Sequence, residues 1–259
     1  MTQDHHDTMV HIQSPGHPWG PVFYASLPRD ADTSPGHGTN GGSVRHRLVS
    51  LLWEHLVTRG RSVGKCDLSS TRVTPRIQVV QDALGKPHLL VGEDRGPAIS
   101  FCEGGGAVWA ALCGDQSDIG IDVAAPDEFQ GGYPVHRVFQ AQEFQHAVRL
   151  TVGNVEQAST LLWSVKEAVV KALGCGFHFI EPWDICVKPS LEEDGQHTFP
   201  VCLSSKARAR LPMSAGRSIR VRTIPQAGMW LSIAFLNGPR RHGDGWECPN
   251  VLVHGRVDV

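Results

Sequence analysis

The chain has 259 residues, with 24 basic and 26 acidic side chains, and its formal net charge is −2 at pH 7. This length allows one or two domains with a sizeable buried core. The near balance of charge, without a basic stripe or polybasic run, argues against a nucleic-acid or membrane-surface protein. The apolar runs are far shorter than the roughly 18 residues of a membrane helix, and the N-terminus does not resemble a signal peptide.

Seven cysteines are present, and none forms a C-x-x-C pair. This pattern argues against a disulfide framework and against a zinc knuckle, so we expect a reducing, cytoplasmic location. Cys175, flanked by glycines, is a candidate for exposure. The other cysteines considered are expected in or near the core: Cys66, Cys102, Cys113, Cys186 and Cys202.

Residues 1–42 are rich in Gly, Pro, His and Asp, which predicts a loop-rich arm with one short strand around Val22–Ala25. The histidines of this arm could bind a metal adventitiously, but a solvated arm is the simpler interpretation. They are His5, His6, His11, His17 and His37.

After the arm, leucines at helical spacing predict a helix over Val44–Thr58 with one buried face. Strands are expected at Ile77–Val80 and His88–Val91, around a turn at Gly85-Lys86-Pro87. A further strand is expected at Ala107–Cys113.

The second half begins with an apolar strand at Ile119–Val123. Helices are predicted over Gln142–Leu150 and Glu156–Leu173, and Gly174 and Gly176 end the second of them. Four more strands follow, at Ile185–Lys188, Val201–Leu203, Ile219–Thr223 and Met229–Leu236.

Two short segments suggest the chemistry. The first is Asp118-Ile119-Gly120-Ile121-Asp122-Val123, an apolar strand that ends on an acid. The second is Trp163-Ser164-Val165-Lys166-Glu167-Ala168-Val169-Val170-Lys171, a helix with an acid and a lysine on one face. Glu167 and Lys171 alone could be an ordinary i,i+4 ion pair, and Asp122 alone could be a turn or capping residue. Two carboxylates with a nearby lysine nevertheless suit a divalent cation and a phosphate-bearing ligand.

These segments resemble the paired motifs of the 4′-phosphopantetheinyl transferase superfamily, in its two-subdomain, surfactin-type branch. The first motif is G-[IV]-D, and the second, some forty residues later, is [FW]-[SAT]-x-K-E-[AS]-x-x-K. Weaker likenesses extend the resemblance over roughly residues 44–236. They are Gly85-Lys86-Pro87, Ile99-Ser100, Arg137-x-Phe139 with Glu143, and Gly174-Cys175-Gly176-Phe177 with Asp184.

The resemblance implies a role for each site residue. Asp122 and Glu167 would bind Mg²⁺, and Glu167 would also take the proton from the attacking serine. The coenzyme A contacts would be Lys86, Pro87, Ser100, Arg45, Lys166 and Lys171. Arg47 is the alternative to Arg45, and Lys166 is either a secondary phosphate contact or a structural residue.

Two departures from the family pattern stand out. The second acid that often follows the motif aspartate is Ala124 here, and the histidine of the family's I-S-H-S segment is Phe101, followed by Cys102. Losing one metal ligand is tolerable because Mg²⁺ commonly keeps several waters. Asp127 or Glu128 could replace the missing acid. Because Phe101 cannot donate a hydrogen bond, these changes also leave open a catalytically weak relative that acts as a scaffold for coenzyme A or a carrier.

The resemblance implies an α/β fold, or α+β in stricter usage. It would be a pseudo-twofold pair of subdomains, each a small, mainly antiparallel sheet packed on a long helix. We expect an arm over 1–42, subdomains over 43–116 and 117–238, and a tail over 239–259. The implied activity is Mg²⁺-dependent transfer of 4′-phosphopantetheine from coenzyme A to a serine of an apo acyl or peptidyl carrier protein, releasing 3′,5′-ADP. One chain holds both halves, so a monomer is expected; the carrier could serve fatty acid, polyketide, peptide or polyunsaturated lipid synthesis.

Overall fold

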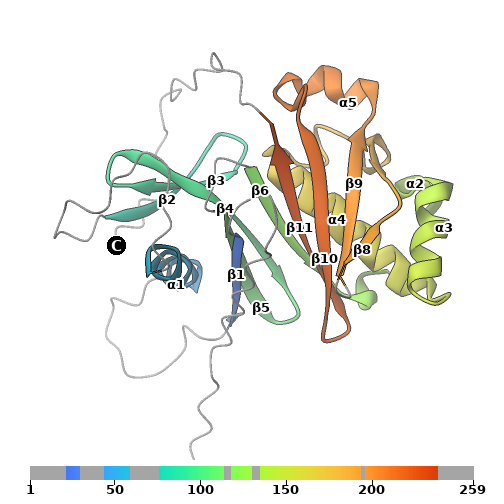
Figure 1. Cartoon of the computed structure of the whole chain (residues 1–259), viewed down its shortest axis with the longest axis horizontal. Coiled ribbons are helices and arrows are strands. Elements are labelled where there is room, and N and C mark those ends of the chain that lie inside the picture. Colours follow the sequence, from blue (N-terminus) through green and yellow to red (C-terminus); the bar gives the residue numbers. More distant parts are fainter. Residues whose placement is uncertain are drawn as a thin grey trace, which may run out of the picture.

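The computed structural model of the protein describes residues 22–29, 44–58, 76–113, 118–129, 135–193 and 196–238. These residues form two antiparallel sheets and several helices (Figure 1). The first sheet comprises β1 (Val22–Pro28), β2 (Ile77–Gln81), β3 (Pro87–Val91), β4 (Asp94–Gly104) and β5 (Ala107–Cys113). The second comprises β6 (Asp118–Ala124), β7 (Ile185–Val187), β8 (Leu191–Glu193), β9 (Gln196–Leu203), β10 (Ser218–Gln226) and β11 (Met229–Asn237). The helices are α1 (Val44–Thr58), α2 (Val135–Val138), α3 (Ala141–Leu150), α4 (Val155–Leu173) and α5 (Ser205–Arg210).

The first sheet has the strand order β1-β5-β4-β3-β2 and is covered by α1. The leucine face predicted for α1 lies in the core, where Leu48, Leu52 and Leu56 are fully buried against Phe23 and Leu112. The sequence analysis did not predict β4 as a strand. Its first half contains a Gly-Pro pair, and the pairing of β3 with β4 shifts register in that region. Such residues weaken the strand signal because they mark irregular pairing.

The second sheet has the order β6-β11-β10-β9-β7, with β8 paired to β9, and α4 packs across β6 and β11. The start of α4 is capped by Asn154, whose side chain accepts the Gln157 N–H. The helix ends at Gly174, whose left-handed φ of 73° is the conformation that favours glycine at a helix end. The predicted glycine stop is therefore confirmed.

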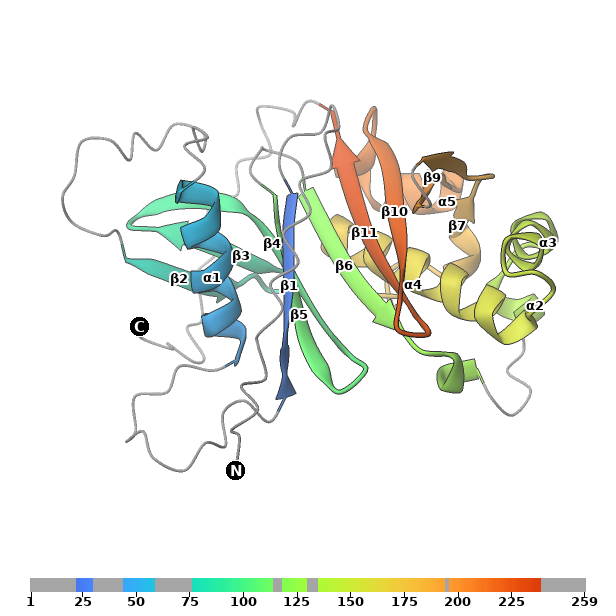
Figure 2. The same ribbon diagram turned by 60° about the horizontal axis from the view of Figure 1, so that its bottom comes forward.

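The molecule is built in four layers, with the two sheets lying between α1 and α4 (Figure 2). Strand β6 is an edge strand of the second sheet and lies against strands β4 and β5 of the first sheet. Ile119, Ile121 and Val123 face the first sheet, whereas Gly120 and Asp122 alternate toward α4. A strand covered on both faces is expected to be continuously apolar. The buried carboxylate of Asp122 breaks this pattern and therefore marks a candidate functional position.

The predicted fold class is confirmed: two antiparallel sheets each carry a long helix. The first sheet starts at Val22, inside the segment expected to be an arm, because the short strand predicted there is a full edge strand paired with β5. The short elements α2, α5 and β8 were not predicted. The arm's histidines, Cys66 and the tail from residue 239 lie outside the described residues.

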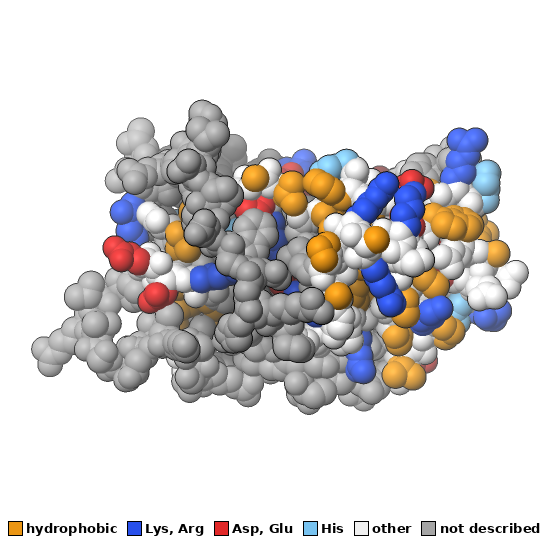
Figure 3. Space-filling view, turned by 90° about the horizontal axis from the view of Figure 1, so that it is seen from above, with side chains coloured by type: hydrophobic (Ala, Val, Ile, Leu, Met, Phe, Trp, Pro, Cys, Tyr) orange, Lys and Arg blue, Asp and Glu red, His pale blue; other side chains and the backbone are white. Residues whose placement is uncertain are grey.

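The end of the molecule that carries α5 displays many Lys and Arg side chains (Figure 3). On α5, Lys206 forms an exposed ion pair with Glu181, and Arg210 donates to the carbonyl oxygen of Phe179. These two cations therefore connect α5 to the segment around Phe179 and Glu181, which follows α4 in the chain. None of the helices in the described ranges is long and apolar enough to cross a membrane.

Candidate active site

Gly120 allows α4 to lie directly on β6. A Cβ atom at this position would come within 2.0 Å of the Ala168 carbonyl oxygen and 2.5 Å of the Ala172 nitrogen. No side chain fits between the two backbones, so this position requires glycine. The close approach brings Asp122, two residues further along the same face of β6, against the turn of α4 that carries Glu167 and Lys171.

Asp122, Glu167 and Lys171 therefore converge at this contact, as the sequence predicted. The Lys171 ammonium donates a hydrogen bond of 2.6 Å to Asp122 Oδ1, within a pair that is largely buried. Glu167 is partly buried and accepts no hydrogen bond from the described part of the chain. Two carboxylates thus share one lysine, which leaves negative charge without a full protein counter-charge.

The electrostatics of the three groups reflect this shortage of positive charge. Burial raises the pKa of Asp122, and Lys171 opposes that rise. Burial, together with the neighbouring charge of Asp122, raises the pKa of Glu167 to about 7. Burial is the largest single effect on Lys171 and lowers its pKa, but the charge and hydrogen bond of Asp122, together with the charges of Cys102 and Glu167, outweigh it and the net pKa is raised. A carboxyl with a pKa near neutrality is suited to accept and release a proton.

The residues after β6 add one more acid nearby. Glu128 lies in the short 3-10 helix Pro126–Phe129 and accepts the Ala125 N–H at 3.0 Å. Its charge contributes to the raised pKa values of both Asp122 and Glu167. Across the described ranges, no three His, Cys, Asp or Glu side chains are grouped closely enough to hold a metal. The ligand set that the structure offers is therefore the pair Asp122 and Glu167.

Strand β4 directs Phe101 and Cys102 to opposite faces. Phe101 packs under α1, where the Arg45 guanidinium lies 5.7 Å from its ring centroid, and Arg45 also pairs with Glu103. Cys102 faces the other way, toward the charges of Asp122 and Lys171, and burial raises the pKa of its thiol well above the usual range. The side chain of β4 that adjoins the acidic pair is thus Cys102, a residue to which the sequence analysis gave no site role.

Lys86, expected to contact phosphate, lies in a buried ion network. Its ammonium donates 2.9 Å to Asp118 Oδ1 and 2.8 Å to the carbonyl oxygen of Ala172 near the end of α4. Arg217 donates to the other Asp118 oxygen at 2.8 Å. This network joins the turn between β2 and β3, the start of β6 and the end of α4. A phosphate contact by Lys86 would require exchange of these bonds. The adjoining Pro87, also expected at the coenzyme A site, is the half-buried first residue of β3 and pairs with Gln81.

Lys166 has the structural role, which was one of the two left open for it. The side chain is fully buried, and its ammonium contacts Glu143 and the carbonyl oxygens of Val138 and Pro182. Glu143 in turn accepts the backbone N–H groups of Gln140 and Val187. Lys166 therefore ties α4 to α3 and β7 and does not face the acidic pair.

Ser100 also serves the scaffold in this structure. It is buried, and its hydroxyl oxygen accepts the Ile121 N–H at 3.1 Å, which links β4 to β6. Ser164, on the helical face shared with Glu167, is fully buried and bonds the Ser232 hydroxyl at 2.7 Å. For Ser100 to contact coenzyme A, its hydroxyl would have to exchange the bond to Ile121 for one to the ligand.

The sequence analysis missed the role of Asp118 and Arg217, which lie ninety-nine positions apart and meet only in the folded chain. The detectable signal was an acid at the start of an otherwise apolar strand, a position where an unpaired charge is costly.

Comparison with known proteins shows which family the segment around this site is similar to. Residues 118–211 match the family model described as the 4′-phosphopantetheinyl transferase superfamily. This match confirms the resemblance to the superfamily, and the matched segment contains Asp122, Glu167 and Lys171. The assignment to its two-subdomain branch stays a prediction.

The solved structures to which the chain is similar include acyl-carrier-protein synthases. The Chronobacterium ammoniagenes ACPS–CoA complex has 18% identity and a TM-score of 0.39, covering 49% of this chain and all of its own. Holo-[acyl-carrier-protein] synthase from Neisseria meningitidis has 15% identity and a TM-score of 0.38, covering 47% of this chain and 98% of its own. No curated protein matches the chain. The family assignment rests on the match over residues 118–211.

Proposed function

We propose that this protein transfers 4′-phosphopantetheine from coenzyme A to a serine of an apo acyl or peptidyl carrier protein and releases 3′,5′-ADP. The observation that supports the proposal is the convergence of Asp122, Glu167 and Lys171 at the contact between β6 and α4. All three residues lie within the matched range 118–211, and the resemblance assigns them to the two motifs of the superfamily.

The residues fit a magnesium ion. Asp122 and Glu167 are oxygen donors with raised pKa values, so a cation beside them would relieve an electrostatic cost that Lys171 offsets only in part. When bound, Mg²⁺ would neutralise charge on the coenzyme A pyrophosphate during transfer. Glu167 and Asp122 are the residues that would hold it.

The chain's own groups would do the remaining chemistry. Glu167 would accept the proton of the carrier serine, because burial and the charge of Asp122 make its carboxylate more basic than an ordinary one in the metal-free protein. Lys171, partly exposed and already beside Asp122, would stabilise the charge that builds on the phosphate oxygens. The serine oxygen would attack the β-phosphorus, and the bond from that phosphorus to the oxygen of 3′,5′-ADP would break.

A binding scaffold is the second candidate function, and specific observations favour it. Lys86 and Ser100 are engaged in buried bonds, Phe101 packs under α1, and Ala124 leaves the metal with two acids. A scaffold would bind coenzyme A or the carrier without transferring the arm.

One experiment separates the two functions. Apo carrier proteins are incubated with the protein, coenzyme A and Mg²⁺, and each carrier is weighed by mass spectrometry. Transfer adds about 340 Da, the mass of the phosphopantetheine arm that this reaction moves. The Glu54→Gln variant, altered at an exposed acid on α1, should retain transfer, whereas Glu167→Gln should lose it. Coenzyme A binding without any mass gain would establish the scaffold.

A further inference from the structure

Two cysteines face each other at the edge of the second sheet, away from the acidic pair. Cys186 in β7 is paired directly with Cys202 in β9. Both thiols are free and half-buried. Residues opposite each other in an antiparallel pair project to the same face, so the two thiols share one side of the sheet.

The hydrogen bonds on either side of the pair define its geometry. The Lys188 N–H donates to the Pro200 carbonyl oxygen, and the Ser204 N–H donates to the Asp184 carbonyl oxygen. Because hydrogen-bonded pairs alternate every two residues, Cys186 and Cys202 also occupy a hydrogen-bonded pair, with Cα atoms about 5.5 Å apart. This Cα separation lies within the range that a disulfide spans, and the S–S bond would draw the two Cβ atoms closer than they lie in an ordinary hydrogen-bonded pair.

A cation accompanies the two sulfurs. Lys188 lies two residues after Cys186, just beyond the end of β7, and its exposed side chain borders the same hollow as Cys186.

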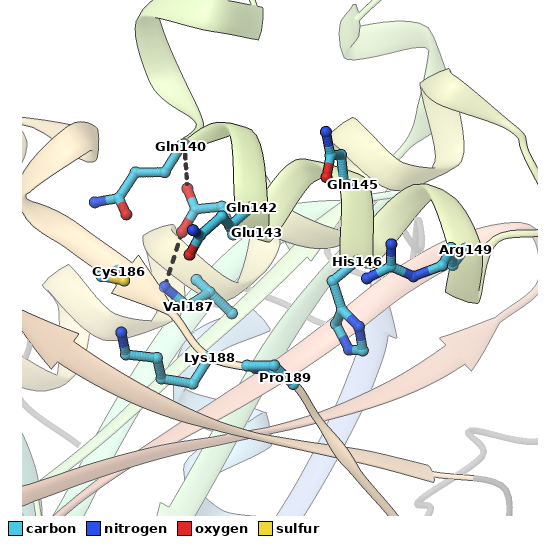
Figure 4. Close-up of a pocket in the computed structure, with 10 residues that line it drawn as sticks. All are labelled: Gln140, Gln142, Glu143, Gln145, His146, Arg149, Cys186, Val187, Lys188 and Pro189. Carbon is cyan, nitrogen blue, oxygen red and sulfur yellow. Dashed lines mark hydrogen bonds between the residues drawn. The ribbon is translucent and has the colours of Figure 1, made fainter.

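The pair is also accessible from outside. Cys186 and Lys188 line a hollow of about 200 Å³ between α3 and β7, shown in Figure 4. Cys202 borders a second hollow of about 280 Å³ beside α5. A small reagent can therefore approach the pair, whereas Cys102 and Cys113 are enclosed in the core.

We infer that Cys186 and Cys202 form a dithiol modification site that closes to a disulfide by exchange with a small organic disulfide. The Cys186 thiol loses its proton, and its sulfur attacks one sulfur of the reagent and expels the first small thiolate. The Cys202 sulfur, after losing its own proton, attacks the sulfur of Cys186 and expels the second. The S–S bond of the reagent is reduced, the cysteine pair is oxidised, and the two thiolates take up the two protons.

The bridge would fix the edge strand β7 to β9. Val187, between Cys186 and Lys188, binds Glu143, which holds the buried Lys166 of α4. The modification would therefore stabilise the side of the second sheet that supports α4. This site is separate from the transfer chemistry and does not depend on it.

The test uses the full chain in buffers that contain oxidised and reduced glutathione at several ratios. Peptide mapping of the oxidised protein should give one linked peptide pair, Cys186 with Cys202, lighter by two hydrogen atoms and restored by reductant. In Cys202→Ala, glutathione should accumulate on Cys186 as a mixed disulfide. Lys206→Gln, altered at an exposed lysine on α5, should form the same linked pair as the parent.

Three results would overturn the inference. The cysteines could stay reduced at ratios that oxidise an ordinary dithiol pair, each could carry its own glutathione without a link, or one could link to Cys175 instead. Circular dichroism of the reduced variants checks that each is folded, so a loss of linkage reports on the site itself.

Discussion

Replacement of Glu167 by glutamine should stabilise the metal-free protein, and only at neutral and alkaline pH. Folding raises the pKa of Glu167 from 4.5 to about 7, because burial and the charge of Asp122 disfavour its carboxylate. The folded state thus holds a proton that the unfolded state releases. This contribution to stability is complete below pH 4.5 and is lost as the pH rises through about 7.

The size of the effect follows from the shift. One pKa unit corresponds to about 1.4 kcal/mol, so the full shift would cost about 3 kcal/mol. Glu167 is partly exposed, and solvent screening reduces this to about 2 kcal/mol. Glutamine has the shape of the protonated acid and no charge to bury. The variant should therefore match the parent near pH 4.5 and exceed it by about 2 kcal/mol above pH 8.

Urea unfolding in EDTA, repeated across this pH range, measures the difference. EDTA is needed because a bound cation would favour the carboxylate and mask the effect. Glu54→Gln is the matched control on α1 and should shift stability by less than about 0.5 kcal/mol at every pH. A Glu167→Gln advantage that is independent of pH, or a loss of stability at pH 8, would refute the reasoning.

Three further predictions concern the same contact. Asp122→Ala and Glu167→Ala should each lower carrier modification by at least ~10², measured as turnover, while the far-UV spectrum is kept; near-normal turnover at limiting Mg²⁺ would contradict the metal assignment. Ala124→Glu should lower the half-saturating Mg²⁺ concentration, since position 124 follows Asp122 on the same face of β6 and a third acid strengthens binding; an unchanged titration in a folded variant would mean that this position does not face the metal. Gly120→Ala should destabilise by about 3 kcal/mol in thermal or urea unfolding, because its Cβ would meet the Ala168 carbonyl oxygen; a loss below about 1 kcal/mol would show that α4 can move away.

The sequence by itself determined the long elements and the acidic pair. Leucine spacing set α1, the apolar stripe and Gly174 set α4, and the spacing of the motifs brought Asp122 and Glu167 into one hypothesis. The two helices depend on local periodicity and capping, which neighbouring residues specify without reference to the rest of the chain. The pairing of Asp122 with Glu167 depends on the resemblance of the two motifs to those of a known family.

The tertiary structure decided which polar residues face the site. Lys86, Ser100 and Lys166 carry the residue types of ligand contacts, yet each is bonded to a partner from another element. Their partners lie between 16 and 86 positions away in the chain, so no local pattern predicts them. The opposite directions of Phe101 and Cys102, and the meeting of Cys186 with Cys202, likewise follow from strand register, which only the assembled sheets define.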